Sequence, residues 1–271
     1  MDRRRLPALS RPTWMTGAHH GDEPIPLAES PIQIAPLQAL PSHAAKQEDG
    51  ANRGSIVVRL KGTLVHRDPD MWAYPSFLSD CECEHLIRLS AGRFLTSLTS
   101  LGKEGAQQQS YESGRSVNRT SLSARLMSGE TRTLSIIEEK VAKIACVPLA
   151  YVEQLVVVKY EPGEFFAMHH DGDFRPQTVL LYLNDVDEGG QTDFPDLPKP
   201  LAIKPQKGMA LVWSNINPDG SADYRMMHQG LPPTSSVKYA VNCFINRDPI
   251  RLLASDEQRG PFCPFSSPKM Q

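Results

Sequence analysis

The stretch LVVVKYEPGEFFAMHHDGDF, residues 155–174, joins an apolar run with three consecutive valines to a window of two histidines and two aspartates. A short apolar run bounded by the turn-forming pair Pro162-Gly163 is the pattern of a buried strand. Further short apolar runs follow, separated by turn formers and without helical spacing: TVLLYL, LAIKP, GMALVW and KYAVNCFI. This pattern predicts an all-β sandwich or barrel over about residues 154–248.

Upstream of this β region, two segments have helical patterns. In SFLSDCECEHLIRLSAGRF, Ser79 can cap a helix, because Glu82 lies three residues later and apolar side chains follow. In residues 128–147, apolar side chains recur at helical spacing. We therefore expect an α+β protein with a mainly β core that is supported by helices from its N-terminal half. Glu82, Glu138 and Glu139 are interpreted as parts of solvated helix faces.

Composition divides the chain into three parts. Residues 1–54 are rich in proline, alanine and glutamine and lack periodicity, which predicts a disordered or loosely ordered segment. One domain is expected over residues 55–250, with its first strand within 55–67, and a C-terminal tail is expected over 251–271. The polar run 102–114 is predicted to be a mobile loop.

Charge and composition exclude several classes of function. The net charge of -2 and the pI of about 6.4 show no basic excess, so nucleic acid is not an expected partner. No run of about 18 apolar residues predicts a membrane span. The N-terminus lacks the apolar run of a signal peptide, and five scattered cysteines fit a reducing compartment. We therefore expect a cytoplasmic protein.

The window MHHDGDF is either a polar loop that binds nothing or part of a metal site. Residues i and i+2 of a strand face the same side, so His169 and Asp171 would point together and His170 would point away. An oxygen-activating iron needs a second histidine to complete a face of two histidines and one carboxylate. His228 is the other histidine of the β region, and Lys238 follows ten positions later on an apolar strand. An ammonium on such a strand requires a buried anionic partner.

These features together resemble the catalytic domain of prolyl 4-hydroxylases, which are iron(II)- and 2-oxoglutarate-dependent dioxygenases. The resemblance covers about residues 76–248. The matching segments are FLSDCECEHLIRL, NRTSLSARL, IIEEKVAKIACVPLAYVEQLVVVKYEPGEFFAMHHD, RPQTVLLYLNDVDEGGQTDFP, KPQKGMALVW and HQGLPPTSSVKYAVNCFI.

The register of the family separates the two neighbouring histidines. In that register His169 and Asp171 are the expected ligands, and His170 is expected to be an adjacent residue that does not bind the metal. The family's run of Tyr-x2-Gly-x2-aromatic-x2-His-x-Asp is matched here by Tyr160, Gly163, Phe166, His169 and Asp171.

The resemblance implies a double-stranded β-helix (jelly roll) in which Fe(II) binds His169, Asp171 and His228. It also implies that the far carboxylate of 2-oxoglutarate pairs with Lys238. Two further positions help to hold this co-substrate through hydroxyl groups, and here they are Tyr160 and Thr192. Four positions line the peptide groove in relatives, and here they are Arg119, Ser121, Glu153 and Arg175. The alternative for these last two sets is that they are ordinary sheet residues and surface charges.

The expected function is hydroxylation of prolyl residues in a peptide or protein, with release of succinate and CO2. The resemblance implies Fe(II), 2-oxoglutarate and dioxygen as requirements, and L-ascorbate as reductant. One alternative is a related oxygenase that hydroxylates a small molecule or free amino acid, and another is a non-catalytic β-barrel binding module. Three departures from the family pattern leave the substrate class open: Gln191 where glutamate is frequent, Ser236 in place of glycine and Phe244 in place of tryptophan.

Overall fold

The computed structural model describes residues 61–100, 113–114 and 117–251. The predicted N-terminal segment, most of the predicted loop over 102–114 and the chain beyond Arg251 lie outside these described residues. The last two residues of that predicted loop form β5 (Ser113–Gly114), which pairs with β4 (Thr99–Ser100). The loop prediction is therefore too long at its C-terminal end. Of the first strand expected within 55–67, the structure describes β1 (Thr63–His66).

Helix α1 (Asp80–Ser90) begins where the sequence predicts it. The Ser79 hydroxyl accepts a hydrogen bond from the Glu82 N–H at 3.3 Å, and the Glu82 carboxylate accepts one from the Ser79 N–H at 2.8 Å. This reciprocal pair satisfies two backbone donors that a helix N-terminus otherwise leaves open. The predicted capping box is therefore confirmed.

Helix α2 (Arg132–Ile144) covers the second segment with helical spacing. Thr131 caps it by accepting the Leu134 N–H at 3.0 Å. Leu134, Ile137 and Val141 recur at three- and four-residue intervals and are fully buried, so this face packs against the sheet. The 3-10 helix η3 (Leu149–Tyr151) then leads the chain into the first strand of the β region.

Two antiparallel sheets make up the core of the molecule. In the large sheet, β14 is an interior strand between β9 and β7. The large sheet contains, in spatial order, β1, β2 (Met71–Tyr74), β12 (Ala210–Ser214), β9 (Gln177–Tyr182), β14 (Lys238–Ile245), β7 (Val156–Tyr160), β6 (Leu122–Arg125) and β3 (Leu95–Thr96). The small sheet contains β11 (Leu201–Ile203), β10 (Thr192–Phe194), β13 (His228–Gly230) and β8 (Phe166–His169).

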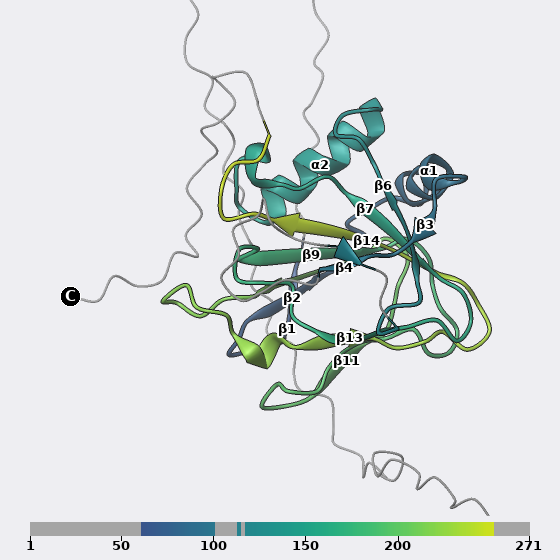
Figure 1. Cartoon of the computed structure of the whole chain (residues 1–271). Helices are drawn as coiled ribbons and strands as arrows, with labels where there is room; N and C mark the ends of the chain where they lie inside the picture. The colour runs from purple at the N-terminus through teal and green to yellow at the C-terminus, as the bar shows by residue number, and fades with distance from the viewer. Residues whose placement is uncertain (1–60, 101–112, 115–116, 252–271) are drawn as a thin grey trace, which may run out of the picture.

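The large sheet buries both of its faces, and Figure 1 shows α1 and α2 on one side of it and β11 and β13 on the other. Alternate residues of β14 divide between the two cores: Val241 and Cys243 pack with the helices, and Ala240 packs with the small sheet. Such alternation is the consequence of the two-residue period of a strand. Two facing antiparallel sheets with helices behind one of them form the jelly roll that the family resemblance implies.

The strands expected from the runs LVVVKY, TVLLYL, LAIKP, GMALVW and KYAVNCFI are all present, as β7, β9, β11, β12 and β14. The interpretation of Glu138 as a solvated residue is wrong, because this side chain is 2 % exposed. Its carboxylate lies 3.0 Å from Nη2 of Arg251, which neutralises the buried charge. Among the described residues, no helix is long and apolar enough to cross a membrane.

Candidate metal centre and co-substrate pocket

The three residues predicted to bind a metal converge between the two sheets. His169 ends β8, His228 begins β13, and the antiparallel pairing of these strands places the two residues opposite each other. One potential ligand atom from each histidine and from Asp171 lie within 4.8 Å of one another. The two-residue period of a strand does not by itself place Asp171 beside His169, because β8 ends at His169 and Asp171 lies beyond it. The described residues contain no second His/Cys/Asp/Glu group of this kind.

Backbone carbonyls orient both imidazoles toward the cluster. Nδ1 of His169 lies 2.9 Å from the Ala167 oxygen, and Nδ1 of His228 lies 3.0 Å from the Met226 oxygen. Because a carbonyl can only accept, each Nδ1 carries a proton, which leaves Nε2 as the ring nitrogen that can bind a metal. Burial, with a contribution from nearby His228, lowers the pKa of His169 to about 3, which keeps that ring neutral.

The carboxylate of Asp171 completes the cluster. Its two oxygens lie 3.7 Å from Nε2 of His169 and 3.7 Å from Nε2 of His228, respectively. Burial works to raise the pKa of Asp171, but His228, His169 and a hydrogen bond from Thr178 outweigh it, and the pKa is lowered. The group is therefore an anion at neutral pH. Two imidazole nitrogens and one anionic carboxylate share the site.

His170 lies outside the cluster although it is adjacent in sequence. Its Nδ1 accepts the Gly172 N–H at 3.0 Å, and its ring faces Tyr224 at a centroid distance of 5.8 Å. The neighbouring histidines thus contact different parts of the molecule, and only His169 contributes to the group of potential ligands.

Aromatic side chains pack around the two histidine ligands. Phe166 stacks on His169 at a centroid distance of 3.6 Å. Phe194 and Trp213 each lie 5.2 Å from the ring of His228. These contacts hold the imidazoles in place and bury the ring of His228. The sequence analysis did not identify Trp213 as part of the site.

Lys238 is buried beside the same cavity, with 2 % of its surface exposed. Burial lowers the pKa of its ammonium to about 7. Its Nζ lies 5.2 Å from the ring centroid of Tyr160 and 5.7 Å from that of Tyr182, and no carboxylate among the described residues forms an ion pair with it. A water-facing edge lysine is excluded, because β14 is an interior strand.

Tyr182 is a buried residue behind the cavity wall that the sequence analysis missed. Its hydroxyl donates to Thr192 Oγ1 at 2.8 Å, and Thr192 and Tyr160 line the cavity with Lys238. The sequence could have indicated Tyr182, because this residue follows Thr178 and Leu180 at the two-residue period that places all three on one face of the strand.

The four residues predicted to line a peptide groove form two contacting pairs. Arg119 Nε donates to Ser121 Oγ at 3.1 Å, and the Arg119 guanidinium lies 4.3 Å from the Phe166 ring centroid. Nη2 of Arg119 is buried and has no hydrogen-bond partner within the described part of the chain. Arg175 and Glu153 form a bidentate ion pair with both N–H···O distances at 2.8 Å.

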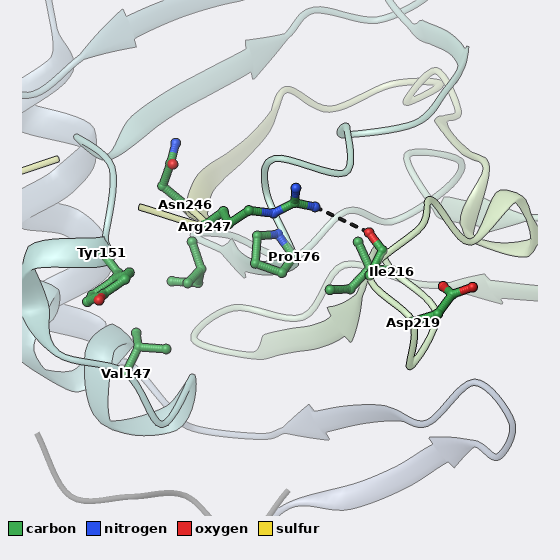
Figure 2. A pocket seen from close by; sticks show the side chains of 9 residues that line it. Val147, Tyr151, Pro176, Ile216, Asp219, Asn246 and Arg247 are labelled. Carbon is green, nitrogen blue, oxygen red and sulfur yellow. Dashed lines mark hydrogen bonds between the residues drawn. The ribbon is translucent and has the colours of Figure 1, made fainter. Parts of the chain in front are cut away.

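A wider cavity of about 520 Å³ lies elsewhere, between the end of α2 and the loop that follows β12. Figure 2 shows Arg247 in its middle, with Tyr151 on one side and Ile216 on the other. None of the three clustered residues lines this cavity, and neither does Lys238. The residues that can carry chemistry therefore gather in the narrower cavity between the sheets.

Comparison with known proteins agrees with this geometry. Residues 155–246 match the family model described as the 2OG-Fe(II) oxygenase superfamily. The chain is 33 % identical over 183 residues to "Probable prolyl 4-hydroxylase 11" of Arabidopsis thaliana, a match that covers 61 % of this chain and 63 % of the relative. It is 31 % identical over 223 residues to "Prolyl 4-hydroxylase 2" of the same plant, a match that covers 72 % and 73 %, respectively.

A solved structure shares the fold as well. The viral collagen prolyl hydroxylase of Paramecium bursaria Chlorella virus 1, in its 2-oxoglutarate complex, is 27 % identical and superimposes with a TM-score of 0.51. That match covers 65 % of this chain and 94 % of the viral chain. Fold and site thus define a 2-oxoglutarate- and iron(II)-dependent dioxygenase. Within that class, the chain belongs to the prolyl 4-hydroxylase family.

Proposed function

We propose that this chain hydroxylates prolyl residues in a peptide or protein, with Fe(II) held by His169, Asp171 and His228. The observation that carries the proposal is the convergence of these three donor groups beside the buried Lys238. The choice of a prolyl substrate is supported by the names of the relatives, which are prolyl 4-hydroxylases and a collagen prolyl hydroxylase.

The donor set is suited to iron(II). Two imidazole nitrogens and one carboxylate oxygen are the ligands of oxygen-activating non-haem iron, and three protein ligands leave positions for co-substrate and dioxygen. When bound, iron would activate dioxygen, which supplies one oxygen atom to succinate as 2-oxoglutarate loses CO2 and the other to the hydroxylated substrate. The protein orients the groups and excludes water, through the rings of Phe166, Phe194 and Trp213.

Lys238 is proposed to hold the far carboxylate of 2-oxoglutarate. Its ammonium is buried in the cavity wall and lacks an ion-pair partner within the described residues. A bound carboxylate would supply the missing negative charge in a site from which water is largely excluded. The hydroxyls of Tyr160 and Thr192 line the same cavity and are proposed to contribute hydrogen bonds.

The peptide is proposed to pass Arg119 and the Arg175–Glu153 pair. The buried Nη2 of Arg119 has a donor available, and peptide carbonyl groups are suitable acceptors for it. Arg175 is held rigidly by its bidentate pairing with Glu153 and by its position 3.8 Å from the Phe244 ring centroid. Rigid side chains of this kind can bind an extended peptide with little loss of side-chain entropy.

Two expectations from the sequence stay predictions. L-Ascorbate as reductant is tested by following sustained turnover with and without it. The cytoplasmic location is tested by a fluorescent tag at the C-terminus, and a signal confined to secretory compartments would contradict it.

The proposed activity is tested by measuring succinate release with proline-rich peptides, together with mass spectrometry for a product that is heavier by one oxygen atom. We expect His169→Ala, Asp171→Ala and His228→Ala to lose Fe(II)-dependent turnover, since each removes one of three protein donors.

His170→Ala is the matched control, because it removes a neighbouring histidine that lies outside the cluster. We expect this variant to keep most of its activity. An inactive His170→Ala together with an active His169→Ala would overturn the assignment of the ligands. Turnover with free amino acids but with none of the peptides would replace a peptide substrate by a small molecule.

A further inference from the structure

A chain of three buried hydrogen bonds ends on the carboxylate of Asp171. Trp213 Nε1 donates to Asn215 Oδ1 at 2.8 Å, Asn215 Nδ2 donates to Thr178 Oγ1 at 2.9 Å, and Thr178 Oγ1 donates to Asp171 Oδ2 at 2.7 Å. Thr178, Asn215 and Trp213 are 1 %, 0 % and 2 % exposed. Water therefore cannot readily replace any member of this chain.

The direction of the chain is determined by its two ends. The indole N–H of Trp213 can only donate, so the atom of Asn215 that faces it must be the amide oxygen. The amide nitrogen of Asn215 then donates both to Thr178 and, at 2.8 Å, to the carbonyl of Arg175. Since Thr178 accepts from Asn215, the proton of its own hydroxyl is free to point at the carboxylate of Asp171.

The backbone holds these groups in place. Trp213 on β12 and Thr178 on β9 are direct partners in the ladder of the large sheet. Asn215 follows the end of β12, and its N–H donates to the Pro176 carbonyl at 2.9 Å. The rings of Trp213 and His228 also lie in a T-shaped arrangement with their centroids 5.2 Å apart, so one indole contacts a second member of the cluster. The donor to Asp171 thus comes from the interior of a sheet and not from a loop.

We propose that Thr178 is a positioning residue, oriented by Asn215 and Trp213, that fixes the rotation of the Asp171 carboxylate and thereby prepares the cluster for a divalent metal. This inference rests on the proposed metal site. Without the hydroxyl, the carboxylate loses the hydrogen bond that orients it. Partners of this kind typically contribute about 10- to 100-fold to metal affinity.

The experiment is a titration with Co(II) alone, followed by calorimetry, on the full chain and its variants. Thr178→Val has nearly the same shape and lacks the hydroxyl, so we expect its Kd for Co(II) to rise about 10- to 100-fold. Thr178→Ser restores the donor and should bind Co(II) within about threefold of the unmodified chain. Asn215→Asp turns the donor to Thr178 into an acceptor, and it should weaken Co(II) binding as well.

Loss of stability is separated from loss of positioning by a matched control. Ser90→Ala removes an equally buried hydroxyl, which donates to the Ile87 carbonyl at 2.9 Å in α1, far from the cluster in the fold. We expect Ser90→Ala to lower the Tm without changing the Kd for Co(II). Unchanged Co(II) affinity in a folded Thr178→Val overturns the inference and leaves the proposed metal site standing. Unchanged affinity in Asp171→Ala would overturn both.

Discussion

A buried lysine that has no counter-charge among the described residues is the residue that most constrains what this cavity binds. Lys238 is the first residue of the interior strand β14, and burial alone lowers its pKa. Taking an ammonium out of water costs several kcal/mol unless an anion meets it. A ligand with a carboxylate therefore gains affinity here that a neutral ligand does not gain.

Removal of this charge should weaken co-substrate binding. We expect Lys238→Ala to raise the KM for 2-oxoglutarate at least about tenfold, because breaking a buried charge pair typically costs about 2–5 kcal/mol. Co(II) affinity should not change, since no donor of the cluster is altered. Lys238→Arg should rescue only part of the loss, because the wider guanidinium does not fit a space shaped for an ammonium. The measurement is a co-substrate titration at fixed iron for all three proteins.

An unchanged KM in Lys238→Ala would mean that a different cation holds the carboxylate. Arg175 is the next candidate in the sequence, although its guanidinium is already paired with Glu153. The corresponding titration of Arg175→Ala would then decide between the two residues.

The low pKa of Lys238 also predicts how co-substrate binding depends on pH. The pKa of about 7 lies below the ordinary value of 10.5, so the free enzyme loses this positive charge as the pH rises through about 7. Because a carboxylate binds the protonated form, the Kd for 2-oxoglutarate should be constant below that pH and rise above it. The rise approaches about tenfold per pH unit until the pKa of the complex is reached. Binding to Lys238→Arg should lack this dependence, and equal slopes for both proteins would exclude Lys238 as the titrating group.

At the scale of the elements, the helices support the face of the large sheet that is turned away from the cavity. Helix α2 buries Leu134, Ile137 and Val141 against it, and Glu138 on the same helix binds Arg251. Lys140 of α2 also contacts the Glu82 carboxylate at 3.0 Å, which links the two helices. The sheet is thereby held as one layer, and β9, β12 and β14 present their other face to the site.

The capping box of α1 provides a test at this scale. We expect Ser79→Ala to lower the free energy of unfolding by about 0.5–2 kcal/mol, because it leaves a backbone donor of the first turn without its acceptor. Ser79→Asp retains a capping oxygen and should keep most of the stability. Denaturant unfolding of the three proteins measures the difference. A Ser79→Ala protein as stable as the unmodified chain would show that the cap contributes nothing in this fold.

At the scale of the whole molecule, the site exists only because two sheets face each other. Asp171 and His228 are 57 positions apart, and the strands β9, β10, β11 and β12 lie between them in the sequence. The small sheet carries both histidines, and the large sheet carries Lys238 and Thr178. A change that separates the sheets would therefore dismantle the metal cluster and the co-substrate site together.

Much of this arrangement can be read from the amino-acid sequence. The strands are predictable because short apolar runs and turn formers are local patterns, and the capping box of α1 is a local pattern as well. His169, Asp171, His228 and Lys238 were selected from residue type, spacing and resemblance, and the fold brings all four to one cavity. His170 was set aside on strand parity and register, and its ring points to a different neighbour.

Other features depend on contacts between residues that are far apart in the chain. Glu138 belongs to a helix with an ordinary amphipathic pattern, and it is buried because Arg251, 113 positions later, neutralises its charge. The chain from Trp213 to Asp171 arises from the pairing of β12 with β9, which no local pattern specifies. A polar side chain can be buried only where a partner meets it, and the partner is known only when the chain has folded.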